Sequence, residues 1–305
     1  MSQNVTKTKK NKNHWVPNEH GAWAMIITPW LTGLTLSHWT LAQGWLLLAS
    51  LSGLGAYHTL TVYVRSRNPQ PIKQPLGTYT TITILGLLAA AITQPALIWW
   101  TPIALLLVVP IQQALIKKDR DLPARTLITL TAVMLLPITY DLGWQTPRPQ
   151  NPNLPQLLAP GLNPNQPNIG WALNPQGIPN PTPLWHHPTQ GGWKYIWILT
   201  IIYALYFIGT TPYVKSLIRG RRNPAWRTTT TGYHLGAGVI IIGTITSGWA
   251  SLTMIPLWTI IILRAITIPQ LNQKRINQKK KPIRPAPIGI LEIILTIGIY
   301  LGATL

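Results

Sequence analysis

Long apolar stretches alternate with short polar or basic segments along almost the whole chain. A helix that crosses a bilayer needs ~20 mostly apolar residues, with ~17 as the lower limit. Nine stretches reach or approach this length, at 22–39, 43–64, 78–94, 97–116, 125–143, 194–214, 229–247, 249–268 and 287–304. The pattern predicts an all-α polytopic membrane protein with about nine transmembrane helices.

Threonine and proline recur inside the predicted spans. A threonine hydroxyl can bond to a carbonyl of the preceding turn, which makes it tolerable in lipid. Proline removes one helix hydrogen bond, so kinks are predicted at Pro29, Pro102, Pro110, Pro137 and Pro256.

Charge gives the predicted bundle an orientation. Only 10% of the 305 residues are charged, against about 25% in soluble domains, and the formal net charge is +20. Lysine and arginine gather before the first span and after the second, fourth, sixth and eighth, and only Arg148 and Lys194 fall on the other side. The positive-inside rule then places the N-terminus in the cytoplasm and the C-terminus outside.

The same distribution limits the partners. Because the basic segments are dispersed between apolar spans, nucleic acid is not a predicted partner. We expect these segments to contact anionic headgroups of the lipid bilayer. Cysteine is absent, which excludes disulfides and thiolate ligands, and no metal or cofactor site is predicted.

Four segments follow from these patterns. A basic cytosolic N-terminus covers 1–21, and a first transmembrane half covers 22–143. An outer loop at 144–193, rich in proline and asparagine, is expected to be irregular. A second transmembrane half covers 194–305 and contains a basic cytosolic loop at 270–286.

The entrance to the first span holds the candidate acid–base residues. Glu19 and His20 are adjacent at the predicted cytosolic interface, where such a pair could perform proton transfer. A purely structural interpretation stays open, because Asn18 suits a helix N-cap and a carboxylate in the first turn is favoured by the helix dipole.

The run Pro17-Asn18-Glu19-His20-Gly21-Ala22-Trp23-Ala24-Met25 resembles the opening signature of the YwiC-like family of bacterial membrane proteins. The stretch from Pro212 to Arg219, Asn223-Pro224 and Tyr233-His234 is similar to the same family. The resemblance implies a multi-pass protein of the bacterial cytoplasmic (inner) membrane, and it implies no particular activity.

One basic motif occurs twice. Tyr63-Val64-Arg65-Ser66, followed by Arg67-Asn68-Pro69, recurs as Tyr213-Val214-Lys215-Ser216 and then Arg222-Asn223-Pro224. The copies follow the second and sixth predicted helices, so they agree with two four-helix repeats plus one helix. Ligands of membrane proteins built from repeats lie between the repeats.

This arrangement is similar to that of UbiA-type intramembrane prenyltransferases. In that family the loops after helices two and six carry Asp-rich motifs that bind magnesium and a prenyl diphosphate. Here residues 61–76 and 211–232 contain no Asp or Glu, whereas Mg²⁺ prefers carboxylate oxygens. Metal-dependent prenyl transfer is therefore not predicted, although the architecture could be shared.

Arginine and lysine in these loops point to an anion instead, because a guanidinium binds phosphate or carboxylate bidentately. Glu292 lies inside the last span, where an acid needs a partner, and Arg264 is one candidate. In the loop 117–121 we expect the two acids to pair with the cations beside them. The predicted ligand-binding residues are His58, Arg65, Arg67, Lys215, Arg219, Arg222, His234 and Glu292.

The function hypothesis is a cytosolic-facing intramembrane site for an anionic ligand that is phosphate-bearing or lipid-like, such as an isoprenoid. Two alternatives stay open: a membrane transporter, and a non-catalytic accessory subunit of a membrane complex. Most of the basic charges are also explained by topology and lipid contact alone.

Overall fold

The computed structural model describes residue 15 and residues 20–37, 39–144, 192–218 and 220–304. Within these ranges the chain forms helices and no strand. The predicted outer loop at 144–193 lies almost wholly outside the described residues. The helices are α1 (His20–Thr35), α2 (Leu41–Arg65), α3 (Gln70–Thr93), η1 (Pro95–Leu107), α4 (Val108–Leu115), α5 (Leu122–Val133), α6 (Leu135–Trp144), α7 (Gly192–Leu217), α8 (Pro224–Thr246), α9 (Met254–Asn277) and α10 (Pro285–Thr304).

In the described part of the chain these elements form nine segments, because η1 continues into α4 and α5 into α6. By length and composition, six of the segments are able to cross a membrane: α3, η1 with α4, α5 with α6, α7, α9 and α10. The protein is therefore an all-α, multi-pass membrane protein. The expectation of about nine spans is compatible with these nine segments. The other three segments, α1, α2 and α8, are shorter or less apolar than the six candidate spans.

Two of the helical segments are irregular at prolines where kinks were predicted. η1 is a 3-10 helix that contains Pro102 and passes into α4 just before Pro110. The break between α5 and α6 lies at Met134, and Pro137 has no N–H to bond the carbonyl of Val133. Proline therefore explains where these two segments depart from a regular α-helix.

Two helices are longer than the apolar pattern predicts, each at the end that carries basic residues. α3 begins at Gln70 rather than 78, and α9 continues to Asn277 rather than 268. The added turns are polar, as in Lys73, Lys274 and Arg275. A helix can extend past the hydrocarbon layer into the headgroup region, where apolarity is no longer required.

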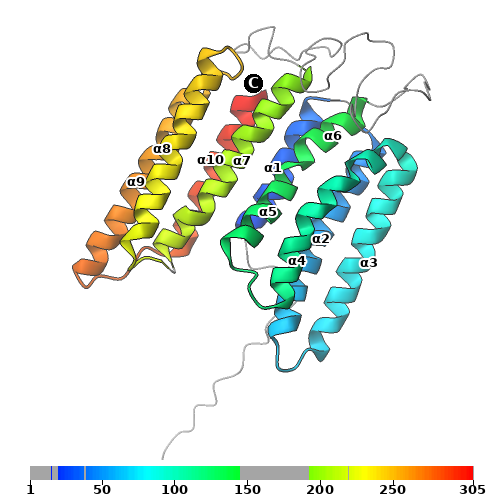
Figure 1. The fold of residues 1–305 in the computed structure, drawn as a ribbon, viewed down its shortest axis with the longest axis horizontal. Helices are drawn as coiled ribbons and strands as arrows, with labels where there is room; N and C mark the ends of the chain where they lie inside the picture. Colours follow the sequence, from blue (N-terminus) through cyan, green and yellow to red (C-terminus); the bar gives the residue numbers. More distant parts are fainter. Residues whose placement is uncertain (1–14, 16–19, 38, 145–191, 219, 305) are drawn as a thin grey trace, which may run out of the picture.

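The first helix lies in the middle of the bundle. α1 packs against α2, α5, α6, α7 and α10, so the first and last helices of the chain are neighbours. Figure 1 shows α7 to α10 on one side of this helix and α2 to α6 on the other. A hydrogen bond of 3.0 Å between the hydroxyls of Thr35 and Tyr300 joins α1 to α10.

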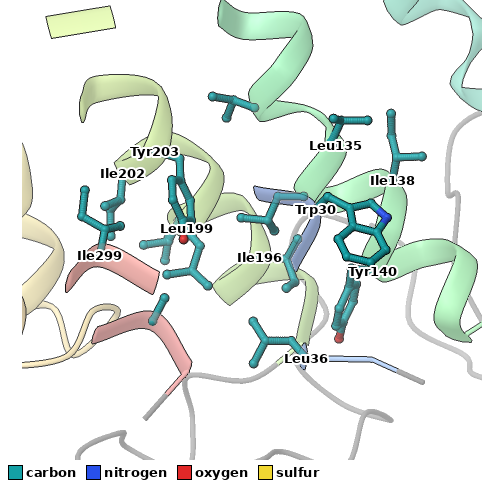
Figure 2. Packing of buried hydrophobic residues seen from close by; sticks show 14 of the residues in the cluster. Trp30, Leu36, Leu135, Ile138, Tyr140, Ile196, Leu199, Ile202, Tyr203 and Ile299 are labelled. Carbon is teal, nitrogen blue, oxygen red and sulfur yellow. The ribbon is translucent and has the colours of Figure 1, made fainter. Parts of the chain in front are cut away.

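Large aliphatic and aromatic side chains fill the space between α1, α6, α7 and α10 (Figure 2). Two hydrogen bonds link helices inside this core. The hydroxyls of Thr32 and Tyr203 lie 2.7 Å apart. The Gln43 amide donates to the Thr139 carbonyl at 2.8 Å. Threonine hydroxyls also bond carbonyls of the preceding turn, as in Thr83 to Tyr79 at 2.7 Å, which confirms the predicted role of threonine.

The outer surface of the bundle is apolar, in contrast to that of a soluble protein. Long stretches of α3, α8 and α10 expose aliphatic side chains to the surroundings. Such continuous apolar surface is rare on soluble proteins and is expected where lipid is the solvent. The exposed aliphatic residues on these helices include Ile84, Leu85, Leu88, Ile92, Leu235, Val239, Ile242, Ile290, Ile294 and Ile297.

Candidate functional site

Basic residues gather at one end of the bundle. The connections α2–α3, α4–α5, α7–α8 and α9–α10 all lie at this end, which is the lower end in Figure 1. Among the described residues, Lys194 is the basic residue at the opposite end, where its Nζ lies 4.0 Å from the Trp249 ring. We call this lower end the basic end.

The two copies of the repeated motif build similar helical hairpins. In each copy the asparagine side chain accepts from the N–H two residues further on. The side-chain oxygen of Asn68 accepts from the Gln70 N–H at 3.4 Å, and that of Asn223 accepts from the Ala225 N–H at 3.0 Å. Asn223 is the N-cap of α8, whereas Pro69 is the N-cap residue of α3, so Asn-Pro lies at the start of the second helix of each hairpin.

A tyrosine of the second helix also packs on a glycine of the first in both hairpins. A Cβ added at Gly55 of α2 would lie 2.8 Å from the Tyr79 ring of α3. The same addition at Gly209 of α7 would lie 2.7 Å from the Tyr233 ring of α8. The hydrogen of glycine is what permits this close approach.

The basic residues of the two hairpins have different partners. Arg65, at the end of α2, forms an ion pair with Asp119 and donates to the Lys117 carbonyl at 3.1 Å. The expectation that Asp119 pairs with the cations beside it in the loop was therefore wrong. In the second hairpin, Lys215 Nζ lies 3.8 Å from the centre of the Trp226 ring. Arg67 of the first hairpin and Arg222 of the second are exposed.

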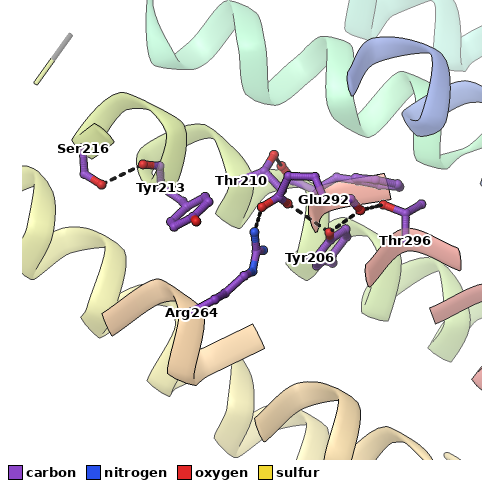
Figure 3. Close-up of polar contacts among 8 residues, drawn as sticks. Tyr206, Thr210, Tyr213, Ser216, Arg264, Glu292 and Thr296 are labelled. Carbon is purple, nitrogen blue, oxygen red and sulfur yellow. Dashed lines mark hydrogen bonds and ion pairs between the residues drawn. The ribbon is translucent and has the colours of Figure 1, made fainter. Parts of the chain in front are cut away.

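A buried ion pair lies deeper in the second half. Arg264 of α9 pairs with the Glu292 carboxylate of α10, as predicted, and its side chain is 3% exposed (Figure 3). The Tyr206 hydroxyl of α7 lies 3.0 Å from the same carboxylate and 3.1 Å from the Glu292 backbone carbonyl. Three helices therefore meet at one carboxylate.

Aromatic rings complete the surroundings of Arg264. Its guanidinium carbon lies 4.5 Å from the Tyr213 ring centre and 5.4 Å from that of Tyr206. His234 of α8 is 1% exposed and its ring meets that of Tyr213 edge to face, with centroids 6.4 Å apart. We call Tyr206, Tyr213, His234, Arg264 and Glu292 the buried polar cluster.

The cluster lies inside the helical bundle, nearer its basic end. Arg264 is four residues, or ~6 Å at 1.5 Å per residue, before position 268, where the polar extension of α9 begins. Glu292 is seven residues, or ~10 Å, from the start of α10 at the basic end.

Several atoms of the cluster have no hydrogen-bond partner among the described residues. They include His234 Nε2 and the Nε and Nη2 atoms of Arg264, whereas Nη1 of Arg264 is the atom paired with Glu292. One carboxylate cannot satisfy the five N–H donors of a guanidinium. Each buried polar atom that lacks a partner calls for an explanation, such as a bound water or ion.

The other predicted site residues that the structure describes are not part of this cluster. Glu19 and Arg219 lie outside the described residues, and only the backbone of His20 is described, as the first residue of α1. His58 is half-buried on α2, which packs against α1, α3, α4 and α6. Of the predicted ligand-binding residues, His234 and Glu292 are brought together in the cluster.

One buried acid was missed by the sequence analysis. Asp141 of α6 is fully buried, and its carboxylate accepts from the Trp100 indole N–H at 2.8 Å. Asp141 is one of five acids in the chain and lies inside a predicted span. An acid at such a position is rare and could have marked Asp141 as a candidate site residue from the sequence. Among the described residues no three His, Cys, Asp or Glu side chains are grouped as metal ligands would be.

Comparison with known proteins gives a consistent assignment. The sequence model of the YwiC-like protein family matches residues 16–140. The uncharacterised protein YwiC of Bacillus subtilis (strain 168) is 27% identical over 248 residues, which cover 79% of this chain and 82% of that protein. No solved structure matches the chain. The chain is therefore similar to the YwiC-like family over residues 16–140 and to YwiC over most of its length.

Proposed function

We propose that this protein binds an anionic, phosphate-bearing or lipid-like molecule inside the membrane, at the buried polar cluster. The observation that carries the proposal is the buried Arg264, whose Nη1 pairs with Glu292 while its Nε and Nη2 have no hydrogen-bond partner among the described residues. A guanidinium presents paired donors that match a phosphate or carboxylate, so a ligand would complete the set. Ionisable residues in a membrane span usually serve such a function.

Entry from the basic end is part of the proposal. Tyr213 lies four residues before the end of α7, about 6 Å along the axis, and its ring contacts the Arg264 guanidinium. Lys215, Arg221 and Arg222 follow it and would attract an anion to this point. Arg65 is engaged by Asp119, so we place the centre of the site in the second hairpin rather than the first.

The test is whether a bound anion depends on the pair. Because removal of one charge alone would destabilise the fold, the informative variant is Arg264→Gln with Glu292→Gln, which removes both charges. Arg275→Gln is the matched control, since Arg275 is an exposed arginine in the last turn of the same helix. Each protein is purified in mild detergent and its bound molecules are measured by native mass spectrometry.

The expected result is an anionic ligand that is retained by wild type and Arg275→Gln and lost by the neutral-pair variant. Equal ligand content in a neutral-pair variant that elutes and melts as a folded protein would refute the proposal. Co-purification of a partner complex without any small molecule would favour an accessory subunit instead.

Transport is a second candidate, favoured by the buried ion pair, because ionisable residues inside membrane spans mark substrate and ion pathways. Counterflow of radiolabelled phosphate in proteoliposomes, lost in the neutral-pair variant, would support transport. Binding without counterflow would restrict the protein to a binding role.

We also propose that the basic end faces the cytoplasm of a bacterial inner membrane. The gathering of described basic residues at one end supports this through the positive-inside rule. The chain has no cysteine, so single cysteines report topology cleanly. Ser66→Cys should react with an impermeant maleimide only after lysis, and Leu252→Cys, which lies on the α8–α9 connection, should react in intact cells. The reverse labelling would overturn the orientation.

A further inference from the structure

The connection between α9 and α10 carries positive charge that no acid in the described part of the chain balances. The sequence has no Asp or Glu between Asp141 and Glu292. None of the basic side chains in this connection pairs with a carboxylate among the described residues. We call residues 272–284 the basic connection, and its exposed basic residues are Lys274, Arg275, Lys279, Lys280, Lys281 and Arg284.

Hydrogen bonds hold the basic connection in one folded arrangement. The buried Asn272 amide donates to the Leu217 carbonyl at the end of α7 at 3.2 Å, and its oxygen accepts from the Ile283 N–H at 2.9 Å. Arg275 Nε donates to the Lys281 carbonyl at 3.1 Å. The cations are therefore fixed to the end of α7 and are not spread over a loose linker.

Asn272 also sets the depth of the basic connection in the membrane. The apolar part of α9 ends at position 268, and Asn272 follows it by four residues, or ~6 Å along the helix. The headgroup layer is ~5–8 Å thick on each side of the hydrocarbon core. Because Ile283 is bonded to Asn272, the chain returns to this depth after its turn. The long basic side chains near this level can therefore reach lipid phosphates.

Lys279 has a backbone conformation that favours glycine, with a φ of 57°. Its N–H bonds to the Ile276 carbonyl at 2.9 Å. The Lys280 N–H bonds to the Arg275 carbonyl at 2.8 Å, which completes the pattern of a Schellman turn at a helix end. Glycine is the usual residue at this position, so lysine lowers the stability of the turn and adds a positive charge there. This cost supports a role for the charge itself.

We infer that the basic connection is a binding surface for the headgroups of anionic phospholipids, at a site separate from the buried polar cluster. The surface presents several cations at headgroup depth, and the connection contains no acid that would compete for them. Anionic lipids supply net negative charge at that depth, whereas a zwitterionic headgroup brings a positive charge with its phosphate. Asn272 acts as a positioning residue, because it is buried and fixes the connection to α7.

Lipid preference measured by native mass spectrometry tests this inference. The full-length protein in mild detergent is titrated with equal amounts of dioleoyl phosphatidylglycerol and dioleoyl phosphatidylcholine, and the ratio of the two bound lipids is recorded. The triple variant carries Lys279→Gln, Lys280→Gln and Lys281→Gln. The matched control removes the same charge from exposed residues of the first half, by Lys73→Gln, Lys118→Gln and Arg120→Gln.

The triple variant should lose at least about tenfold of the preference for phosphatidylglycerol, because each basic residue near an anionic surface contributes about fivefold to binding. The control should keep most of the preference. Asn272→Ala keeps every charge and should still lower the preference, because it releases the connection from α7. Lys279→Gly should melt at or above the wild-type temperature, since it removes the unfavourable φ, and yet lower the preference. A purely structural role for Lys279 would not separate these two readouts.

Several results would overturn the inference. Equal binding of both lipids by wild type would leave a soluble anionic partner for this surface. An unchanged ratio in the triple variant, or an equal loss in the control, would show that these lysines form no site. An unchanged ratio in Asn272→Ala would overturn its positioning role. Arg264→Gln with Glu292→Gln should keep the preference, so failure of this inference and failure of the proposed function are distinguishable.

Discussion

The buried ion pair makes a strong prediction about stability. Glu292→Gln removes the carboxylate and leaves the Arg264 guanidinium, which is 3% exposed, without a counter-charge. Removal of one partner of a buried pair costs about 3–5 kcal/mol, because the remaining charge is uncompensated. At about 2 °C per kcal/mol for a chain of this size, the melting temperature should fall by about 6–10 °C.

The double variant Arg264→Met with Glu292→Leu should recover most of this loss. Apolar side chains of similar volume remove the cost of burying both charges. The Tyr206 hydroxyl keeps an acceptor, because it also lies 3.1 Å from the Glu292 backbone carbonyl. Thermal unfolding in detergent, followed by intrinsic tryptophan fluorescence, measures all variants in one experiment.

The reasoning is refuted if Glu292→Gln melts within about 2 °C of wild type, since that corresponds to roughly 1 kcal/mol and not to an isolated buried charge. It is also refuted if the double variant melts as low as the single one. In that case the loss would come from packing at α9 and α10 rather than from charge.

Three further changes have distinct expected effects. Asp119→Asn breaks the partly exposed pair with Arg65, and because such pairs contribute about 0.2–1 kcal/mol, the melting temperature should change by less than about 2 °C. Asn272→Ala removes bonds to the Leu217 carbonyl and the Ile283 N–H, so we expect a loss of about 1–3 kcal/mol and faster proteolysis of the α9–α10 connection, with no such change if Asn272 is dispensable. Gly209→Ala should destabilise by about 1–3 kcal/mol because its Cβ meets the Tyr233 ring, and a wild-type melting temperature would show that the ring yields freely.

The apolar stretches of the sequence were sufficient to predict the helical segments, because a helix that is surrounded by lipid must be apolar in composition. It was less accurate at the basic end, where α3 and α9 continue as polar helix into the headgroup region. The partner of Glu292 was predictable, because a buried acid needs a cation and Arg264 is the nearby intramembrane one.

Contacts between distant segments were not predictable in the same way. Asp119 has cations on both sides in sequence, yet it pairs with Arg65, which is 54 positions away. The convergence of Tyr206, Tyr213 and His234 on Arg264 depends on the rotation of three helices, which a one-dimensional pattern does not specify. The division of the chain into two related halves stays a prediction, supported by the similar asparagine hydrogen bonds and glycine–tyrosine contacts of the two hairpins.

The ion pair also matters during membrane insertion, because the helices enter the bilayer in chain order. Arg264 enters the membrane with α9, before Glu292 of α10 has been delivered. An arginine inside a span costs up to about 2.5–3.5 kcal/mol on insertion, and at that stage the Tyr206 and Tyr213 rings of α7 are already present to stabilise it. α10 then supplies the missing charge and packs on both α1 and α9. A chain truncated before α10 therefore retains an unpaired intramembrane charge, a defect that membrane quality-control proteases can recognise.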